Sequence, residues 1–134
     1  MIYLASPYTH ENKSKQLERA MNAMIATGKL LELGINAYSP TVHWCVYGQS
    51  SDKAGYDHFR VHDEEMILLC ERFVILELEG WQDSEGVTKE MIFAYNNRKL
   101  IESANFYDLA LGRFRPQIVG SWFYKEKTNG TSEK

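Results

Sequence analysis

An acidic residue, Glu90, lies on the apolar side of the helix expected at residues 84–96. Successive residues of a helix turn by about 100°, which puts Glu90 between Val87 and Ala94 of the apolar stripe. The remaining members of that stripe are Met91 and Tyr95. A carboxylate in such a position must be paired, protonated or used in chemistry, because burying an unpaired charge is costly. We therefore interpret Glu90 as a functional carboxylate.

A second acidic residue, Asp63, occupies the same kind of position in the helix expected at residues 56–71. The apolar stripe of that helix consists of Phe59, Met66 and Cys70. If the helix leads back into a strand at residues 73–78, Asp63 lies in the half nearest the carboxyl edge of the sheet, where it could share a pocket with Glu90. The alternative is that Asp63 pairs with Arg60 or a histidine and only supports packing.

Strands and helices alternate along the chain, a pattern typical of an α/β fold. Strands are expected at residues 1–5, 35–38, 73–78, 99–101 and 118–124. Helices are expected at residues 14–33, 56–71 and 84–96, and a loop or short helix at 41–48. The prediction is a single-domain, doubly wound, mostly parallel sheet of the Rossmann or flavodoxin-like kind, with helices on both faces. Residues 1–125 would form this domain and residues 126–134 a polar tail.

The helix expected at residues 14–33 carries large apolar side chains at helical spacing. We predict that four of them face the core: Leu17, Met21, Met24 and Leu31. Gly28 completes this stripe, and its small size would allow close packing on the sheet. Gly34 is expected to end the helix.

Ligands of open parallel sheets bind at the carboxyl ends of the strands. Those ends are expected at residues 6–8, 39–44 and 79–84. At the third end, Ser84 is a good helix N-cap and Gly86 allows a close approach to the backbone, so the first helical N–H groups suit a phosphate or another anion. A well-capped helix without a ligand would have the same residues, and that alternative stays open.

Size and charge restrict the class of protein. The chain has 134 residues, 44% of them hydrophobic and 25% charged, and its formal net charge is −3. This mild acidity argues against binding nucleic acid polymers or anionic membranes. No apolar run reaches the roughly 18 residues of a membrane span and no signal peptide is recognised, so we expect a cytoplasmic protein. Cys45 and Cys70 would then be reduced thiols.

Metal and cofactor motifs are weak or absent in the sequence. His58 and His62 are four residues apart beside Asp63, and His43 and Cys45 precede them, but no further ligand set follows. There is no P-loop, no G-x-G-x-x-G and no nucleophile elbow of the G-x-S-x-G kind. We therefore expect neither a metal nor a cofactor.

A series of short segments between residues 2 and 101 forms a recognisable pattern. Its members are Ile-Tyr-Leu-Ala-Ser-Pro-Tyr at residues 2–8, Asp63, Glu-Arg-Phe-Val-Ile-Leu at residues 71–76, Gly80-Trp81 and Ser84-x-Gly86-x-x-x-Glu90. Together they resemble the nucleoside 2-deoxyribosyltransferase-like family, and the last segment is the most specific. The chain departs from the family pattern at Glu71, where aspartate is usual, and in its last thirty residues, which do not align.

The resemblance implies a role for each matching residue. Glu90 would be the nucleophile that attacks the anomeric carbon of a nucleoside, Asp63 would hold the sugar and Tyr3 would orient the Glu90 carboxylate. Ser84 stands where members that transfer between free nucleosides tend to have aspartate. It resembles the serine that binds the 5′-phosphate in 2′-deoxynucleoside 5′-monophosphate N-hydrolases. The candidate substrate-binding residues are Ser6, Tyr8, Trp81, Ser84 and Gly86, and the candidates for stacking on the base are Tyr8, Trp44 and Trp81.

We therefore expect an N-glycosidase or deoxyribosyltransferase that acts on a (deoxy)nucleoside or a nucleoside 5′-monophosphate, similar to small, phage-type relatives. The alternatives are a non-catalytic nucleotide-binding or sequestering protein, an NAD-type glycohydrolase, and a structural role in which the acids form buried ion pairs. The expected partners are a small-molecule nucleoside or nucleotide and, from the family likeness, further copies of the chain in a homodimer or larger homo-oligomer. Residues 106–124, rich in aromatic and apolar side chains, are the candidate contact between copies.

Overall fold

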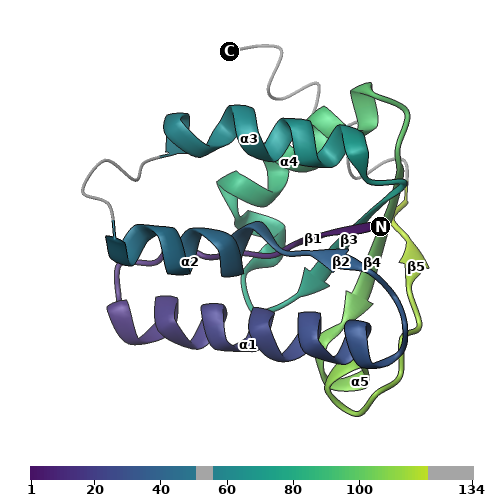
Figure 1. The fold of residues 1–134 in the computed structure, drawn as a ribbon, viewed down its shortest axis with the longest axis horizontal. Helices are drawn as coiled ribbons and strands as arrows, with labels where there is room; N and C mark the ends of the chain where they lie inside the picture. Colours follow the sequence, from purple (N-terminus) through teal and green to yellow (C-terminus); the bar gives the residue numbers. More distant parts are fainter. Residues whose placement is uncertain (51–55, 121–134) are drawn as a thin grey trace.

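The computed structural model describes residues 1–50 and 56–120, without the side chains of residues 46–50 and 56–58 (Figure 1). Its five-stranded sheet has the order β2-β1-β3-β4-β5. The strands are β1 (Ile2–Ala5), β2 (Ala37–Tyr38), β3 (Arg72–Glu77), β4 (Leu100–Asn105) and β5 (Gln117–Ile118). The first four strands in this order are parallel, and β5 is antiparallel to β4.

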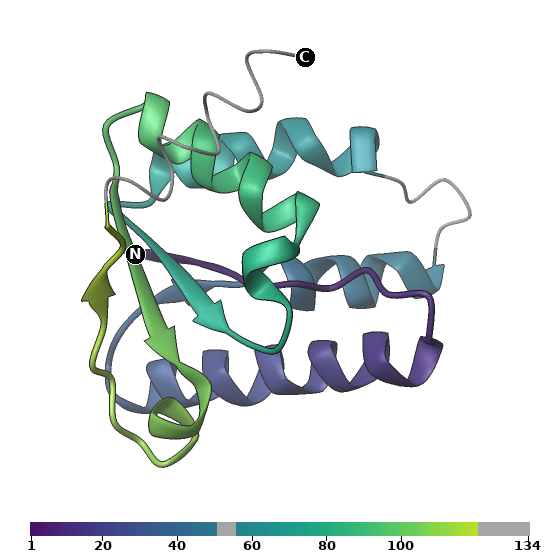
Figure 2. The ribbon, with the colours of Figure 1, turned by 180° about the vertical axis from the view of Figure 1, so that it is seen from behind.

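Helices connect the parallel strands and cover both faces of the sheet. They are α1 (Lys13–Glu32), α2 (Pro40–Ser50), α3 (Tyr56–Leu69), the single 3₁₀ turn η1 (Trp81–Asp83), α4 (Glu85–Asn96) and α5 (Phe106–Ala110). α3 and α4 lie on one face, and α1 and α5 lie on the other (Figure 1, Figure 2). The predicted Rossmann-like, mostly parallel α/β fold is confirmed. None of the described helices combines the length and apolar character needed to cross a bilayer.

The strands divide their side chains between two cores, because successive residues of a strand point to opposite faces. Tyr3 and Phe73, which are neighbours in the sheet, pack under α3 and α4. Leu4 and Val74, one position further along, pack against α1 and α5. Strands that are apolar on both faces are expected for a parallel sheet with helices on each side.

The predicted core face of α1 is wrong. Its buried side chains are Ala20, Ala23, Ala26 and Leu30, and the predicted ones are exposed: Leu17, Met21, Met24 and Leu31. Both sets recur at helical spacing. The alanine face is the buried one because its small side chains let the helix backbone come close to its neighbours. Gly28 does not pack on the sheet, since a Cβ atom there would meet nothing within 4 Å.

The other elements differ from expectation mainly in extent. Residues 41–48 are part of the helix α2. β4 extends to Asn105 in its pairing with β3, and its buried polar residue Glu102 is paired with Arg72 of β3. α5 was not expected, and Asn105 caps it by accepting a hydrogen bond from the Asp108 N–H group. β5 covers only the start of the strand expected at residues 118–124, and residues 121–134, with the predicted tail, lie outside the described residues.

Candidate active site

A cavity of about 770 Å³ opens at the carboxyl edge of the sheet. Its wall comes from the loop after β1, the start of α2, the middle of α3, the loop after β3 and the first turns of α4. Six of the predicted site residues line it: Ser6, Tyr8, Asp63, Ser84, Gly86 and Glu90. The cavity is large enough for a nucleotide-sized ligand, since small-molecule sites usually measure about 300–1,000 Å³.

Tyr3 and Glu90 form a hydrogen bond at the base of this cavity. Tyr3 is fully buried in β1, where its ring stacks on Phe73 at 5.5 Å between centroids. Its hydroxyl donates to Oε2 of Glu90, and the predicted pairing of these two residues is thus present. Burial first, and then the charge of Glu90, raise the pKa of Tyr3 well above its ordinary value, so the hydroxyl keeps its proton and stays a donor.

The Glu90 carboxyl is harder to ionise than an exposed one. Burial raises its pKa to about 8, although the Tyr3 hydrogen bond lowers it, and the charge of Asp63 raises it further. The residues beside it on the helix stripe, Val87 and Met91, are buried in the core between α4 and the sheet. The sequence pattern therefore located this carboxyl correctly at the boundary of the core.

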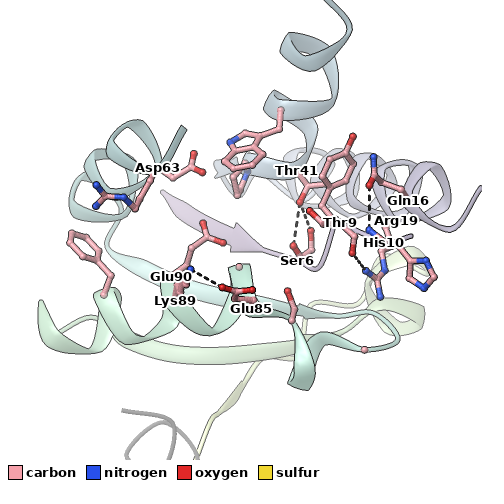
Figure 3. A pocket seen from close by; sticks show the side chains of 18 of the residues that line it. Ser6, Thr9, His10, Gln16, Arg19, Thr41, Asp63, Glu85, Lys89 and Glu90 are labelled. Carbon is pink, nitrogen blue, oxygen red and sulfur yellow. Dashed lines mark hydrogen bonds and ion pairs between the residues drawn. The ribbon is translucent and has the colours of Figure 1, made fainter. Parts of the chain in front are cut away.

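Asp63 faces the same cavity from α3, and its side chain and that of Glu90 both point into it (Figure 3). The residue is 5% exposed, and its Oδ1 atom has no hydrogen-bond partner within the described part of the chain. Burial raises the pKa of Asp63 to about 7, and side-chain hydrogen bonds with Trp44 and Tyr38 partly offset this rise. Arg60, an expected alternative partner, instead pairs with Glu64 at 3.0 Å.

The start of α4 forms a second part of the cavity wall. The Ser84 side chain caps the helix by accepting a hydrogen bond from the Val87 N–H group at 3.3 Å. Gly86 has open space where a Cβ atom would be, so the backbone is accessible. Ser84 is therefore the N-cap that the sequence predicts, at a helix N-terminus that borders the cavity.

On the opposite side, the loop after β1 is held against the start of α2. The hydroxyl groups of Ser6 and Thr41 are 2.9 Å apart, and both residues are buried. Thr41 was not among the candidate site residues. Its position directly after β2 was the available signal, because the carboxyl ends of β1 and β2 are adjacent in a parallel sheet.

Arg19 of α1 is a further cavity residue that the sequence analysis missed. Its guanidinium donates to the carbonyl oxygens of Thr9, at 2.9 Å, and Glu79, at 3.1 Å. Gly80 makes room for it: the residue has φ +85°, and a Cβ atom would lie 2.9 Å from the Arg19 Nη2 atom. Arg19 was missed because the analysis assigned the wrong face of α1 to the interior.

The candidate stacking residues are placed differently. Tyr8 and Trp44 line the cavity, although Trp44 also packs on the Phe59 ring with 4.4 Å between centroids. Trp81 is not among the lining residues and packs against the core beneath α3 and α4. Of the three candidates, Tyr8 and Trp44 therefore line the cavity, and Phe93 is a further aromatic side chain in its wall.

The histidines beside α3 contact one another and Tyr38. The rings of His43 and His62 stack at 5.0 Å, and the Nε2 atom of His62 is 3.2 Å from the Tyr38 hydroxyl. Within the described residues, no group of three or more histidine, cysteine or acidic side chains is arranged to hold a metal ion. The side chain of His58 is outside the described part of the chain.

The fold and the cavity define a Rossmann-like α/β protein with two buried carboxyl groups at the carboxyl edge of its sheet. The chain matches the family model described as "Domain of unknown function (DUF1937)" over residues 1–104, and it belongs to this family. The match includes β1 to β3, α4 and nearly all of β4, and therefore every candidate site residue. No curated protein matches the chain.

Proposed function

We propose that the protein is an N-glycosidase or deoxyribosyltransferase that cleaves the glycosidic bond of a (deoxy)nucleoside or nucleoside 5′-monophosphate. The observation that carries the proposal is the meeting of Glu90 and Asp63 in one cavity, with Tyr3 aimed at the Glu90 carboxylate. Enzymes that cleave a glycosidic bond through a covalent intermediate usually have two carboxyl groups in the site that binds the sugar. The resemblance of residues 2–101 to nucleoside 2-deoxyribosyltransferases supports the same assignment.

In this mechanism Asp63 and Glu90 are each partly protonated near neutral pH, because burial raises the pKa of both carboxyl groups. A sugar that develops positive charge beside Glu90 favours its ionised form, as does the Tyr3 hydroxyl, and leaves the proton on Asp63. Glu90 then attacks the anomeric carbon while the C–N bond breaks. The departing base nitrogen takes the proton from Asp63, and Asp63 later removes a proton from the water or acceptor base that releases the sugar.

The remaining wall residues fit the rest of a nucleotide. Ser84 accepts a hydrogen bond from the backbone but keeps its own O–H group to donate to a phosphate oxygen. The N-terminal N–H groups of α4 add favourable partial charge for that phosphate. Ser6 and Thr41 present hydroxyl groups to a sugar, and Tyr8 and Trp44 offer rings for a base.

The proposal is tested by incubating the protein with a panel of nucleosides, nucleoside 5′-monophosphates and NAD, and measuring released base by chromatography. Glu90→Gln is the test variant, and Glu32→Gln, at an exposed site at the end of α1, is the matched control. We expect base release by the wild type and the control only. Release by Glu90→Gln at the wild-type rate would contradict the mechanism, and nicotinamide release alone would identify an NAD-type glycohydrolase.

A second candidate, a nucleotide-binding protein without catalysis, is favoured by the raised pKa of Glu90. If its carboxyl stays protonated with ligand bound, it is a hydrogen-bond donor and a poor nucleophile. This candidate requires saturable binding of a panel member, measured by calorimetry, with no base released after prolonged incubation. Binding together with turnover would rule it out.

A further inference from the structure

The outer face of α1 carries an apolar stripe that nothing in the described structure covers. Its members are Leu17, Met21, Met24, Ile25, Gly28 and Leu31, which we call the α1 stripe. The large side chains of the stripe are 41–57% exposed. The stripe extends about 21 Å along the helix, from Leu17 to Leu31, at 1.5 Å per residue. A contiguous apolar strip of this kind on a charged helix marks an interaction surface.

The spacing of the stripe is that of a helix that packs lengthwise on another helix. The intervals between Leu17, Met21, Met24, Gly28 and Leu31 alternate between four and three residues. This repeat keeps a seam facing a partner helix over several turns. It is more regular than the packing of α1 on its own domain requires, because that packing uses a separate stripe of alanines.

We infer that the α1 stripe is the contact between two copies of this chain, with their α1 helices antiparallel about a two-fold axis near Met24. In this arrangement Leu17 of one copy lies opposite Leu31 of the other. Met21 lies beside Gly28 of the other copy, whose missing side chain leaves open space for it. A two-fold contact requires one surface that complements itself, and large-against-small at these two positions meets that requirement.

The charges beside the stripe fit the same arrangement. Lys15 pairs with Glu18 at 3.9 Å, and Lys29 pairs with Glu32 at 3.5 Å, near the two ends of the stripe. An antiparallel contact brings the first ion pair of one copy near the second pair of the other, so Lys15 of one copy lies near Glu32 of the other and Glu18 lies near Lys29. A parallel contact would instead put identical charges at the same height. The balance of two lysines and two glutamates also makes an anionic membrane surface a poor partner.

The first test is the mass of the full-length protein in solution, measured by sedimentation velocity across a concentration series. We expect a dimer whose dissociation constant rises at least about tenfold in the double variant Met21→Lys, Met24→Lys, because four ammonium groups would meet at the axis. Leu69→Lys, at a 71% exposed leucine of α3, is the matched control and should leave the dimer intact. Both substituted faces are exposed, so the variants should remain folded, which circular dichroism checks.

The second test distinguishes the direction of the helices. Oxidation of a mixture of Leu17→Cys and Leu31→Cys chains should give the mixed disulfide, whereas each variant alone should cross-link no more than the wild type. A Leu17→Cys chain that cross-links to itself would overturn the antiparallel arrangement. A wild-type monomer, or a dimer unaffected by the double variant, would overturn the interface. In a monomer, a fall in melting temperature on adding the lysines would show that another part of the same chain covers the stripe.

Discussion

The molecule has two places where strands and helices bury carboxyl groups, and it treats them in opposite ways. In the sheet, Glu102 of β4 is 7% exposed and accepts two hydrogen bonds from the Arg72 guanidinium, at 2.8 and 3.0 Å. At the carboxyl edge, Asp63 and Glu90 face a cavity, and among the described residues neither takes part in an ion pair. Glu102 is thus paired with a cation, whereas Asp63 and Glu90 lie beside a cavity that could hold a ligand.

The difference separates a carboxylate that is held in an ion pair from two carboxyl groups that are buried without one among the described residues. A bidentate arginine gives each oxygen of the Glu102 carboxylate a charged hydrogen-bond donor. Burial without a cation raises the pKa of Asp63 to about 7 and that of Glu90 to about 8. These carboxyl groups can exchange a proton near neutral pH, which is the property that acid–base and nucleophilic chemistry requires.

The comparison is tested most strongly at Glu90. We expect Glu90→Gln to lower the rate of base release by about 10³-fold or more, because the amide cannot form the glycosyl ester. The folded state should survive, since a protonated glutamic acid and a glutamine have similar shape. Single-turnover kinetics and thermal unfolding measure the two effects. Loss of the fold together with activity would place Glu90 in the same structural class as Glu102.

The pH dependence of stability should separate the two regions next. A folded-state pKa of about 8 for Glu90, raised from 4.5, means that the native state holds a proton that the unfolded chain releases. The resulting stabilisation is fully present below pH 4.5 and is lost as the pH rises towards 8. Across this window we expect wild type to lose about 5 kcal/mol of unfolding free energy relative to Glu90→Gln, measured by urea denaturation. Parallel curves for the two proteins would contradict the raised pKa.

The converse substitution is Glu102→Gln. It should lower the unfolding free energy by about 2 kcal/mol, because Arg72 loses its bidentate partner while remaining partly buried. The turnover number should stay at the wild-type value, since Glu102 is not among the residues that line the cavity. Urea denaturation and steady-state kinetics give the two values. A large fall in turnover without loss of stability would break the division between the regions.

The smallest effect is expected at Tyr38, whose hydroxyl forms a hydrogen bond with Asp63 that lowers the pKa of Asp63. Tyr38→Phe removes this bond, so the pKa of Asp63 should rise further. The alkaline limb of the rate profile would then move upward by less than about one pH unit, since other contacts remain. His62→Ala, which removes the outer partner of Tyr38 at 3.2 Å and the ring that stacks on His43, is the control and should leave the limb in place. An unshifted limb in Tyr38→Phe would show that Asp63 does not set it.

The sequence was sufficient to predict the fold class and the two acids of the site. In α3 and α4 the large apolar side chains and the acid share one face, so the helical period indicates most of what each helix buries, although in α3 Ile67 is buried and the predicted Met66 is only partly buried. The carboxyl edge then follows from the alternation of elements, which implies parallel strands. For these reasons Asp63 and Glu90 could be assigned to one pocket before any coordinates were considered.

The same method failed for α1, where two apolar stripes compete. Both stripes have the helical period, and leucine and methionine are more hydrophobic than alanine, so the sequence favours burial of the wrong stripe. The distance between the helix and its neighbours decides which stripe is buried, and that distance is not a local property. Arg19 and Thr41 were missed for a related reason. Each joins the site through contacts with segments remote in the chain, which no spacing along one element reveals.

The guanidinium of Arg19 has a consequence for how the cavity admits a ligand. It donates hydrogen bonds to the carbonyl oxygens of Thr9 and Glu79, and so links the segment after β1 to the segment after β3 at the wall of the cavity. An anion that bound this guanidinium would compete with both carbonyl oxygens and would weaken the link between the two segments. The Arg19 side chain is therefore less available to bind a phosphate than an arginine without such partners.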